Sequence, residues 1–318
     1  MGSEGLLFAH SSASLFLPNY VQKLVGKSIF VVPYLYDLHL PEEDGLGVER
    51  RLANEHGFVA NTKQAPKCDV PQKPVVVVLA YPHVSITDDL TPLESDSRFT
   101  VQWRRDTIPP PYPHTTAVIL PGSRLTRSDL LWLSAHPRWV TFLQDHVAAG
   151  GAILGLCGGY QMLGMEVADP NGVEGKAGIS VGLCLLPVKT TIEPVEYKVV
   201  APMEATLDLP DGNESVQVEG FELHCGQTEF SNESIFNQEA RPLITYNSGE
   251  TEGTCMGHVC GTYLHGILNS SAARKFLLAN DCTIPDDSGE FEVDQLDRLA
   301  EHLAKCGLDF GIVSNMFI

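Results

Sequence analysis

The fold is decided by residues 151–163, which read Gly151-Ala-Ile-Leu-Gly-Leu-Cys157-Gly-Gly-Tyr-Gln-Met-Leu163. The apolar run predicts a buried strand, and the cysteine with its two glycines predicts a sharp turn into a helix. Glycines are needed at such a turn because side chains would collide with the neighbouring strand and helix. A helix N-terminus also favours the thiolate form of a cysteine. The stretch therefore predicts a nucleophilic Cys157; the alternative is a cysteine that only packs at a tight turn.

Short apolar segments around this stretch indicate a parallel sheet. The predicted strands are Val75–Leu79, Thr100–Trp103, Ala117–Leu120 and the run that leads to Cys157. Helices are expected at 128–135 and 137–149, so strands alternate with helices. Strands that are apolar on both faces are typical of parallel sheets covered by helices on both sides. We therefore predict an α/β fold with a mainly parallel, doubly wound sheet, followed by a strand-rich region over 180–265.

Composition and charge exclude several classes of partner. The chain has 318 residues and a formal net charge of −19, which argues against nucleic acid and anionic membranes. No apolar run approaches the roughly 20 residues of a membrane span. The N-terminus lacks the basic region of a signal peptide, so we expect a cytoplasmic protein.

Two patterns are discounted as ligand sites. Cys255, His258 and Cys260 could suggest a metal, but residues 253–257 read as a hairpin turn and we expect no metal. Gly26-Lys27-Ser28 imitates the end of a phosphate-binding loop. Val21 stands where that loop needs its first glycine, and a strand follows instead of a helix. We therefore expect no nucleotide site in this chain.

A thiolate nucleophile needs a base and a pair of donors for the developing oxyanion. His265 is the best candidate for the base, because it ends an apolar strand and a glycine follows it. Ligands bind at the carboxyl ends of parallel strands, so Cys157 and His265 are expected at the same edge of the sheet. The backbone N–H groups of Gly122 and Gly158 are the candidate oxyanion donors. The alternatives are a hydrogen-bonded turn histidine and an ordinary strand-end glycine.

These residues belong to an ordered set of motifs that resembles a known family. The motifs are Pro82–Asp88, Pro92–Glu94, Leu120–Ser123, Asp129–Leu133, Gly155–Gly164, Asp169–Gly175, Gly182–Pro187, Gly220–His224 with Gly226, and Gly261–Gly266. The chain resembles class I glutamine amidotransferases, in the branch that contains cobyric acid synthase and cobyrinate diamide synthase. The resemblance covers residues 15–280, and the pair Cys-Gly-Gly-Tyr-Gln and Thr-Tyr-Leu-His-Gly is its most specific part.

The resemblance implies an activity and a fold. Cys157 would attack the side-chain amide of glutamine, with His265 as base and then as acid to ammonia, and water would hydrolyse the thioester. Many class I relatives carry a glutamate two residues after the histidine, but this chain has Ile267 there, so a Cys–His dyad is expected. The fold implied is flavodoxin-like. The ammonia would serve an ATP-dependent amidation of corrin carboxylates, as in cobalamin biosynthesis.

Further site residues are candidates beside the dyad. Gln161 is a candidate for binding substrate because it lies close to Cys157 in sequence; its other interpretation is packing in the first turn of the helix. Glu222 and His224 are candidates for an accessory catalytic or gating role, or they stabilise a strand beside the crevice.

The resemblance also divides the chain into domains. Residues 1–60 look like the end of a synthetase domain, 61–73 a linker, 74–280 the amidotransferase domain and 281–318 a C-terminal helical extension, with a helix at 293–305 capped by Gly307. Most of the synthetase domain of that family has no counterpart here. ATP and Mg²⁺ are therefore expected on a missing or partner synthetase domain, with no cofactor in this chain.

Two other functions stay open from the sequence. One is a stand-alone cysteine γ-glutamyl hydrolase, which would usually keep an acidic residue after the histidine, where Ile267 stands. The other is a non-catalytic or truncated remnant that acts as a binding or regulatory protein; the intact Cys157 and His265 argue against it.

Overall fold

The computed structural model describes residues 46–57, 73–208, 215–231, 236, 239–278 and 295–307. The chain divides into two compact units, Glu42–Asp287 and a second formed by Met1–Pro41 with Ser288–Ile318. The expected strand at 28–33, the turn at 26–28 and most of the linker lie outside the described residues.

In the second unit the structure describes helix α8. It spans Gln295–Lys305, and Gly307 follows with a φ of 84°. The Gly307 N–H donates to the carbonyl of Ala304 at 2.9 Å, which closes the helix end. The predicted C-terminal helix and its glycine cap are confirmed.

Five parallel strands form most of a six-stranded central sheet with the order β15-β16-β6-β4-β1-β3. The parallel strands are β1 (Val75–Leu79), β3 (Thr100–Arg104), β4 (Ala117–Leu120), β6 (Ala152–Leu156) and β16 (Val259–Thr262). The edge strand β15 (Thr254–Met256) pairs antiparallel with β16. Numbered along the chain, the parallel strands lie in the order 2-1-3-4-5, which is the flavodoxin-like doubly wound arrangement. The predicted fold class is confirmed.

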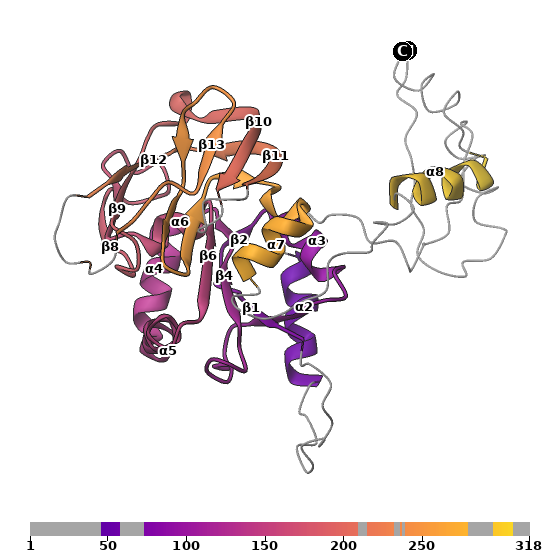
Figure 1. Ribbon diagram of the computed structural model, residues 1–318, viewed down its shortest axis with the longest axis horizontal. Coiled ribbons are helices and arrows are strands. Elements are labelled where there is room, and N and C mark those ends of the chain that lie inside the picture. The colour runs from indigo at the N-terminus through magenta and orange to yellow at the C-terminus, as the bar shows by residue number, and fades with distance from the viewer. Residues whose placement is uncertain are drawn as a thin grey trace, which may run out of the picture. The chain divides into compact units, whose positions relative to one another are not determined.

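Helices cover both faces of this sheet, so its central strands are buried on both sides. Every residue of β4 and β6 is buried. In Figure 1, α4 and α5 lie on one side of the sheet and α2, α3 and α7 on the other. The helices are α2 (Leu46–Gly57), α3 (Thr91–Glu94), α4 (Thr126–Ala135), α5 (Pro137–Ala148), α6 (Gly158–Leu163) and α7 (Ser271–Leu278). The described residues also contain three single-turn helices, η1 (Thr87–Leu90), η2 (Val195–Tyr197) and η3 (Ile267–Asn269). No helix among the described residues is both long and apolar enough to cross a bilayer.

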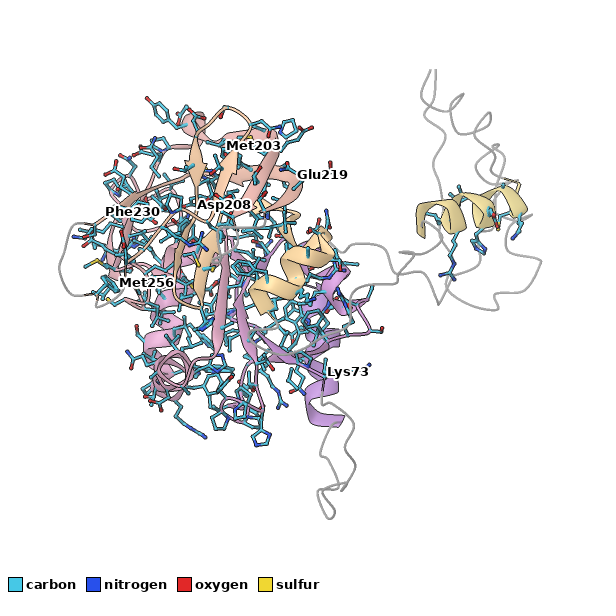
Figure 2. All side chains as sticks on the ribbon, viewed as in Figure 1. Lys73, Met203, Asp208, Glu219, Phe230 and Met256 are labelled. Carbon is cyan, nitrogen blue, oxygen red and sulfur yellow. The ribbon has the colours of Figure 1, made fainter. Side chains whose placement is uncertain are left out.

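Two further sheets form the strand-rich region that the sequence predicts. One sheet has the order β12-β9-β7-β8, and the other has the order β14-β13-β10-β11-β17. Separately from these, β2 pairs with β5. Their bounds are β2 (Val84–Ser85), β5 (Gly122–Ser123), β7 (Glu166–Asp169), β8 (Gly178–Val181), β9 (Val188–Ile192), β10 (Val199–Asp208), β11 (Ser215–His224), β12 (Gly226–Phe230), β13 (Ile244–Tyr246), β14 (Thr251–Glu252) and β17 (Leu264–His265). Phe230, half exposed at the end of β12, lies at the margin of this region in Figure 2.

Residues 253–257 differ from the hairpin turn expected there. Thr254–Met256 is strand β15, and the turn lies at Gly257 and His258. Gly257 has a φ of 59°, which suits glycine at a tight hairpin. The turn therefore starts later than the sequence suggested, and Cys255 and Cys260 lie opposite each other across the ladder.

Helix α2 packs on the α/β unit, although the sequence-based division places it before the linker. Val48 and Leu52 are buried in the common core. The Arg51 guanidinium donates to both oxygens of Glu94, at 2.8 and 2.9 Å, and lies over the ring of Trp103. An apolar face and a bidentate ion pair thus attach residues 46–57 next to β3.

Candidate active site

Cys157 lies at a strained turn between β6 and α6. Its φ of 50° and ψ of −110° are unusual for a residue with a side chain. A Cβ on Gly159 would come within 1.9 Å of the carbonyl oxygen of Leu120, and one on Gly158 within 2.8 Å of the nitrogen of Ser123. Only glycines allow this close approach, so the predicted sharp strand–helix turn at Cys157 is confirmed.

His265 is brought to the same edge of the sheet by β16 and the short strand β17. The Cys157 N–H donates to the carbonyl of Thr262 at 2.9 Å, so the two chain segments run side by side. The imidazole is 1% exposed and stacks on the ring of Phe221, with 5.1 Å between ring centroids. The sequence-based expectation that both residues gather at the carboxyl ends of the parallel strands is confirmed.

A buried carboxylate accompanies His265. The Nδ1–H of His265 donates to Asp89 Oδ2 at 2.7 Å, and Asp89 Oδ1 accepts the Gly266 N–H at 2.9 Å. Burial disfavours a charged ring, but the hydrogen bond to Asp89 and the Cys157 sulfur outweigh it and raise the pKa of His265 to about 10. The Nε2 atom is buried and makes no hydrogen bond within the described part of the chain. The expectation of a histidine without a carboxylate partner is therefore wrong.

Sequence reasoning missed Asp89 because it looked for the acid beside the histidine in the chain. Asp89 lies in η1, which follows β1 and the short strand β2, and is 176 residues before His265. A signal was present, since an acidic pair, Asp88-Asp89, follows a buried parallel strand at the edge where ligands bind.

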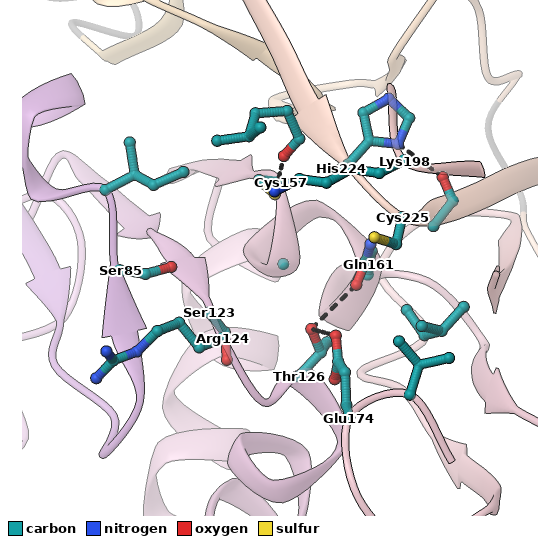
Figure 3. Close-up of a pocket in the computed structure, with 16 residues that line it drawn as sticks. Ser85, Ser123, Arg124, Thr126, Cys157, Gln161, Glu174, Lys198, His224 and Cys225 are labelled. Carbon is teal, nitrogen blue, oxygen red and sulfur yellow. Dashed lines mark hydrogen bonds between the residues drawn. The ribbon is translucent and has the colours of Figure 1, made fainter. Parts of the chain in front are cut away.

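A cavity opens beside Cys157. Its walls come from the ends of the parallel strands and from the second group of sheets (Figure 3). The lining residues are Ser85, Ile86, Ser123, Arg124, Thr126, Cys157, Gly158, Gln161, Val173, Glu174, Ile192, Lys198, Leu223, His224, Cys225 and Gly226. Ile86 has a φ of 53°, a conformation that costs energy for a β-branched side chain. Strained backbone at both Ile86 and Cys157 is typical of functional sites.

The candidate oxyanion donors lie on two sides of the nucleophile. Gly158 lines the cavity directly after Cys157. Gly122 is not among the lining residues, but its neighbour Ser123 is, and Gly122 pairs with Ser85 in the β2–β5 ladder. The Ser123 hydroxyl donates to the buried Asp129 at 2.6 Å, which anchors this loop.

Gln161 lines the cavity, but both ends of its amide are already engaged. Its Oε1 lies 3.0 Å from the Thr126 hydroxyl, and its Nε2 donates to the Tyr263 hydroxyl at 3.2 Å. The side chain is 3% exposed. It therefore joins α4, α6 and the segment before His265, and its role in binding substrate stays a prediction.

Glu222 and His224 lie on β11 next to the site. His224 lines the cavity, donates from Nδ1 to the carbonyl of Gly226 at 2.8 Å, and stacks on Tyr263. Glu222 is buried, accepts the Tyr246 hydroxyl, and lies 3.7 Å from His224 Nε2. Burial opposes its charge, but the nearby His224 and the hydrogen bond from Tyr246 lower the pKa of Glu222. Their accessory role stays a prediction.

The arrangement suits covalent acyl transfer. It combines a thiol, an imidazole held by a carboxylate, and a cavity that reaches the sulfur. Within the described ranges, no group of three or more histidine, cysteine, aspartate or glutamate side chains could hold a metal ion.

Comparisons with known proteins point to one family. A family model described as the CobB/CobQ-like glutamine amidotransferase domain matches residues 75–273. The chain is 37% identical over 235 residues to the cobyric acid synthase of Granulibacter bethesdensis, which covers 72% of this chain and 45% of that protein. It is 31% identical over 296 residues to the cobyric acid synthase of Chlorobium phaeobacteroides, covering 89% of this chain and 53% of that protein. The chain thus spans about half the length of these curated relatives.

One solved structure similar to this chain is PurLQS from Thermotoga maritima. Its TM-score is 0.43 and its sequence identity 16%, over 61% of this chain and 88% of that chain.

Proposed function

The chain belongs to the CobB/CobQ-like glutamine amidotransferase family, and on that premise we propose that it hydrolyses glutamine at Cys157 and supplies the ammonia to an ATP-dependent amidation. The observation that carries this proposal is the Asp89–His265 pair beside a cysteine at a strained turn. A thiol that lies next to an oriented imidazole is the arrangement that acyl transfer from an amide needs.

The proposed reaction has two halves. His265 takes the thiol proton, and the sulfur of Cys157 attacks the side-chain carbonyl carbon of glutamine. The protonated ring then donates its proton to the leaving nitrogen, which departs as ammonia and leaves a γ-glutamyl thioester. Water, activated by the neutral ring, hydrolyses the thioester to glutamate and restores the thiol. The N–H groups of Gly158 and Gly122 are the proposed donors to the oxyanion in both halves.

Asp89 is proposed to act through His265 as its positioning residue. Its carboxylate accepts the Nδ1 proton, so Nε2 is the nitrogen left to exchange a proton with the sulfur. The raised pKa of His265 means that the ring holds a proton more tightly than an isolated histidine, which favours transfer of the thiol proton to Nε2. This supports a Cys157–His265 pair with a carboxylate in place of the bare dyad expected from the sequence.

The acceptor is proposed from the relatives. The similar proteins are named cobyric acid synthases, which suggests corrin carboxylates as acceptors in cobalamin biosynthesis. ATP and Mg²⁺ would then be used on a separate synthetase domain or partner chain. The proposed division of the chain into a synthetase remnant over 1–60, a linker over 61–73, an amidotransferase domain over 74–280 and a helical extension over 281–318 belongs to the same proposal.

A stand-alone γ-glutamyl hydrolase is the second candidate. The sequence argued against it because Ile267 replaces the acidic residue such enzymes usually keep. Asp89 supplies an acid from elsewhere in the chain, which favours this candidate more than the sequence did. Comparing kcat/KM for glutamine with that for γ-glutamyl dipeptides separates the two, since the hydrolase would prefer the peptides.

Labelling with the glutamine analogue 6-diazo-5-oxo-L-norleucine tests the proposed function. We expect one covalent adduct that maps to Cys157 by peptide mass spectrometry, and protection by L-glutamine. Glutamate release should vanish in Cys157→Ala and fall by about 10²–10⁴-fold in His265→Ala. Labelling at another cysteine, or full glutaminase activity in Cys157→Ala, would reject the proposal.

A further inference from the structure

Glu174 is a charged side chain in the cavity that the proposed reaction does not use. It lies in the loop between β7 and β8 and lines the same cavity as Cys157. The fully buried Asp169 holds this loop, because its two carboxylate oxygens accept the N–H groups of Val173 and Glu174 at 2.8 and 2.9 Å. These two hydrogen bonds therefore fix the backbone of Glu174.

One oxygen of the Glu174 carboxylate lacks a partner among the described residues. Its Oε1 lies 3.3 Å from the Thr126 hydroxyl, which also lies 3.0 Å from Gln161 Oε1. One hydroxyl proton cannot serve both acceptors at once. The other oxygen, Oε2, is buried and accepts no hydrogen bond within the described part of the chain. Burial raises the pKa of Glu174, while N–H groups of Thr126 and Arg127 at the start of α4 favour its charged form.

A cation lines the same cavity. Lys198 lines it and makes no hydrogen bond or ion pair among the described residues. Cys225 lines the cavity as well, and its pKa is raised by burial, lowered by Lys198 and raised by Glu174. In Figure 3, Cys225 lies beside Gln161, with Glu174 and Thr126 on one side and Cys157 on the other.

We propose that Glu174 and Lys198 form the subsite for the amino-acid end of the amide substrate. Glu174 binds the α-ammonium group and Lys198 the α-carboxylate, while the side-chain amide lies at Cys157. This assignment rests on the proposed function, because it requires the amide to react at that sulfur. A free α-amino acid is a zwitterion, and a carboxylate and an ammonium group in one cavity recognise both of its charges. Simple amides and γ-amides without these charges would be rejected.

Glu174 has a competing structural role as an acceptor at the start of α4. Such a role would change stability and activity toward every amide alike. Substrate recognition instead changes the discrimination between glutamine and an analogue that lacks the α-ammonium group. The test therefore compares three substrates: L-glutamine, 4-carbamoylbutanoate, which lacks the ammonium group, and 4-aminobutanamide, which lacks the carboxylate.

Hydrolysis of these amides by the full chain is measured as ammonia release. We expect Glu174→Gln to lower kcat/KM for L-glutamine by about 10- to 100-fold, mainly through KM, and to change that for 4-carbamoylbutanoate less than threefold. Lys198→Met should likewise lower kcat/KM for L-glutamine but leave kcat/KM for 4-aminobutanamide unchanged. Lys198→Arg should keep most of the wild-type kcat/KM for L-glutamine. Glu166→Gln, in β7 and outside the cavity lining, is the matched control. Equal loss on all three amides, or no loss on glutamine, overturns the proposal.

A binding measurement separates this proposal from the proposed function. L-Glutamine is titrated by calorimetry into Cys157→Ala and into Cys157→Ala with Glu174→Gln. Weaker binding in the double variant supports the subsite even if the wild-type chain releases no ammonia, in which case the glutaminase proposal alone fails. Equal binding in both variants overturns the subsite and leaves the glutaminase proposal standing. No binding in either variant overturns the subsite.

Discussion

His265 owes its raised pKa chiefly to one carboxylate that lies 176 residues earlier in the chain. The ring is almost fully buried, and burial alone would lower its pKa. Asp89, together with the Cys157 sulfur, reverses this effect, and Asp89 also fixes the proton on Nδ1 and so the tautomer of the proposed base.

Replacing Asp89 by asparagine should separate these effects from folding. An amide group is neutral and can present either its NH₂ group or its oxygen to the ring, so the tautomer is no longer fixed. We expect Asp89→Asn to lower kcat/KM for glutamine by about 10²–10⁴-fold and to lower the pKa of His265. The measurements are ammonia release between pH 5 and 10 and an NMR titration of the imidazole. Asp88→Asn removes the neighbouring acid and should change activity little. Equal losses in both variants would show that any nearby negative charge matters and that the Asp89–His265 hydrogen bond has no specific role.

Gly159 permits the turn that presents Cys157, and its replacement should be costly. A Cβ there would lie 1.9 Å from the carbonyl oxygen of Leu120. Leu120 belongs to β4, in which every residue is buried, so its backbone has no room to move away. We expect Gly159→Ala to lower the free energy of unfolding by about 3 kcal/mol, measured by urea denaturation. Gly150→Ala is the control, because Gly150 has a φ of 93° but nothing within 4 Å of the added Cβ, and should cost about 1 kcal/mol. Comparable losses would contradict the steric argument.

At the scale of elements, an ion cluster secures the chain just after His265. Asp96, which follows α3, accepts Arg274 Nε of α7 at 2.8 Å and Arg98 Nη2 at 2.6 Å. Arg274 also donates to the carbonyls of Leu268 and Asn269 in η3. The cluster therefore ties three elements around the segment that leaves the proposed base.

The stability that Asp96 contributes should depend on pH in a defined window. Burial opposes its charge, but Arg98 and Arg274 outweigh this and lower the pKa of Asp96 from 3.8 to about 2. A lowered pKa means that the stabilisation is present above about pH 4 and is lost as the pH falls through about 2.

We expect Asp96→Asn to destabilise the protein on the order of 3 kcal/mol at pH 7, because Arg274 is left buried without its partner. The difference from wild type should shrink as the pH falls from 4 to 2, measured by urea denaturation at each pH. The exposed Asp145→Asn on α5 serves as the control and should lie within about 0.5 kcal/mol of wild type. A constant difference across that window would contradict the assignment.

The parallel sheet could be predicted from the sequence because its strands are buried on both faces. Val75–Leu79 and Ala117–Leu120 read as apolar runs, and the structure begins and ends β1 and β4 at these residues. Strands β10 and β11 alternate exposed and partly buried residues over much of their length, so the sequence indicated strands there but not their pairing.

Site residues were predictable where they lie in one sequence motif or at the end of a predicted strand. They were not predictable where the fold alone brings them to the site. Cys157 and Gly158 are adjacent, and His265 ends a strand, so local pattern was enough. Asp89 and Glu174 act through contacts set by η1 and by the β7–β8 loop, whose paths depend on the packing of the whole unit. Ile267 stands where related chains carry the acid, whereas in this fold the carboxylate comes from Asp89 at the same edge of the sheet.

At the scale of the whole molecule, the proposed chemistry lies within one compact unit. Every residue that lines the cavity belongs to Glu42–Asp287, and so do Asp89 and His265. The net charge of −19 favours a partner surface or substrate path with basic groups over contact with another acidic surface. The proposed glutamine hydrolysis is thus separable from the proposed use of its ammonia, which would take place on another domain or chain.

This separation predicts that free ammonia can replace glutamine in the amidation. In a reaction with an ATP-dependent synthetase partner and a cobyrinate-type acceptor, Cys157→Ala should abolish amide formation from glutamine and leave amide formation from ammonium chloride unchanged. Ammonia needs no thioester, so only the step at Cys157 is bypassed. The measurement is mass spectrometry of the acceptor with each nitrogen source, using ¹⁵N-amide glutamine to trace the transferred atom. If Cys157→Ala also lost the ammonia-dependent reaction although its free energy of unfolding matched wild type, the sulfur would have to act in amidation itself. In that case the proposed separation of glutamine hydrolysis from amidation would be wrong.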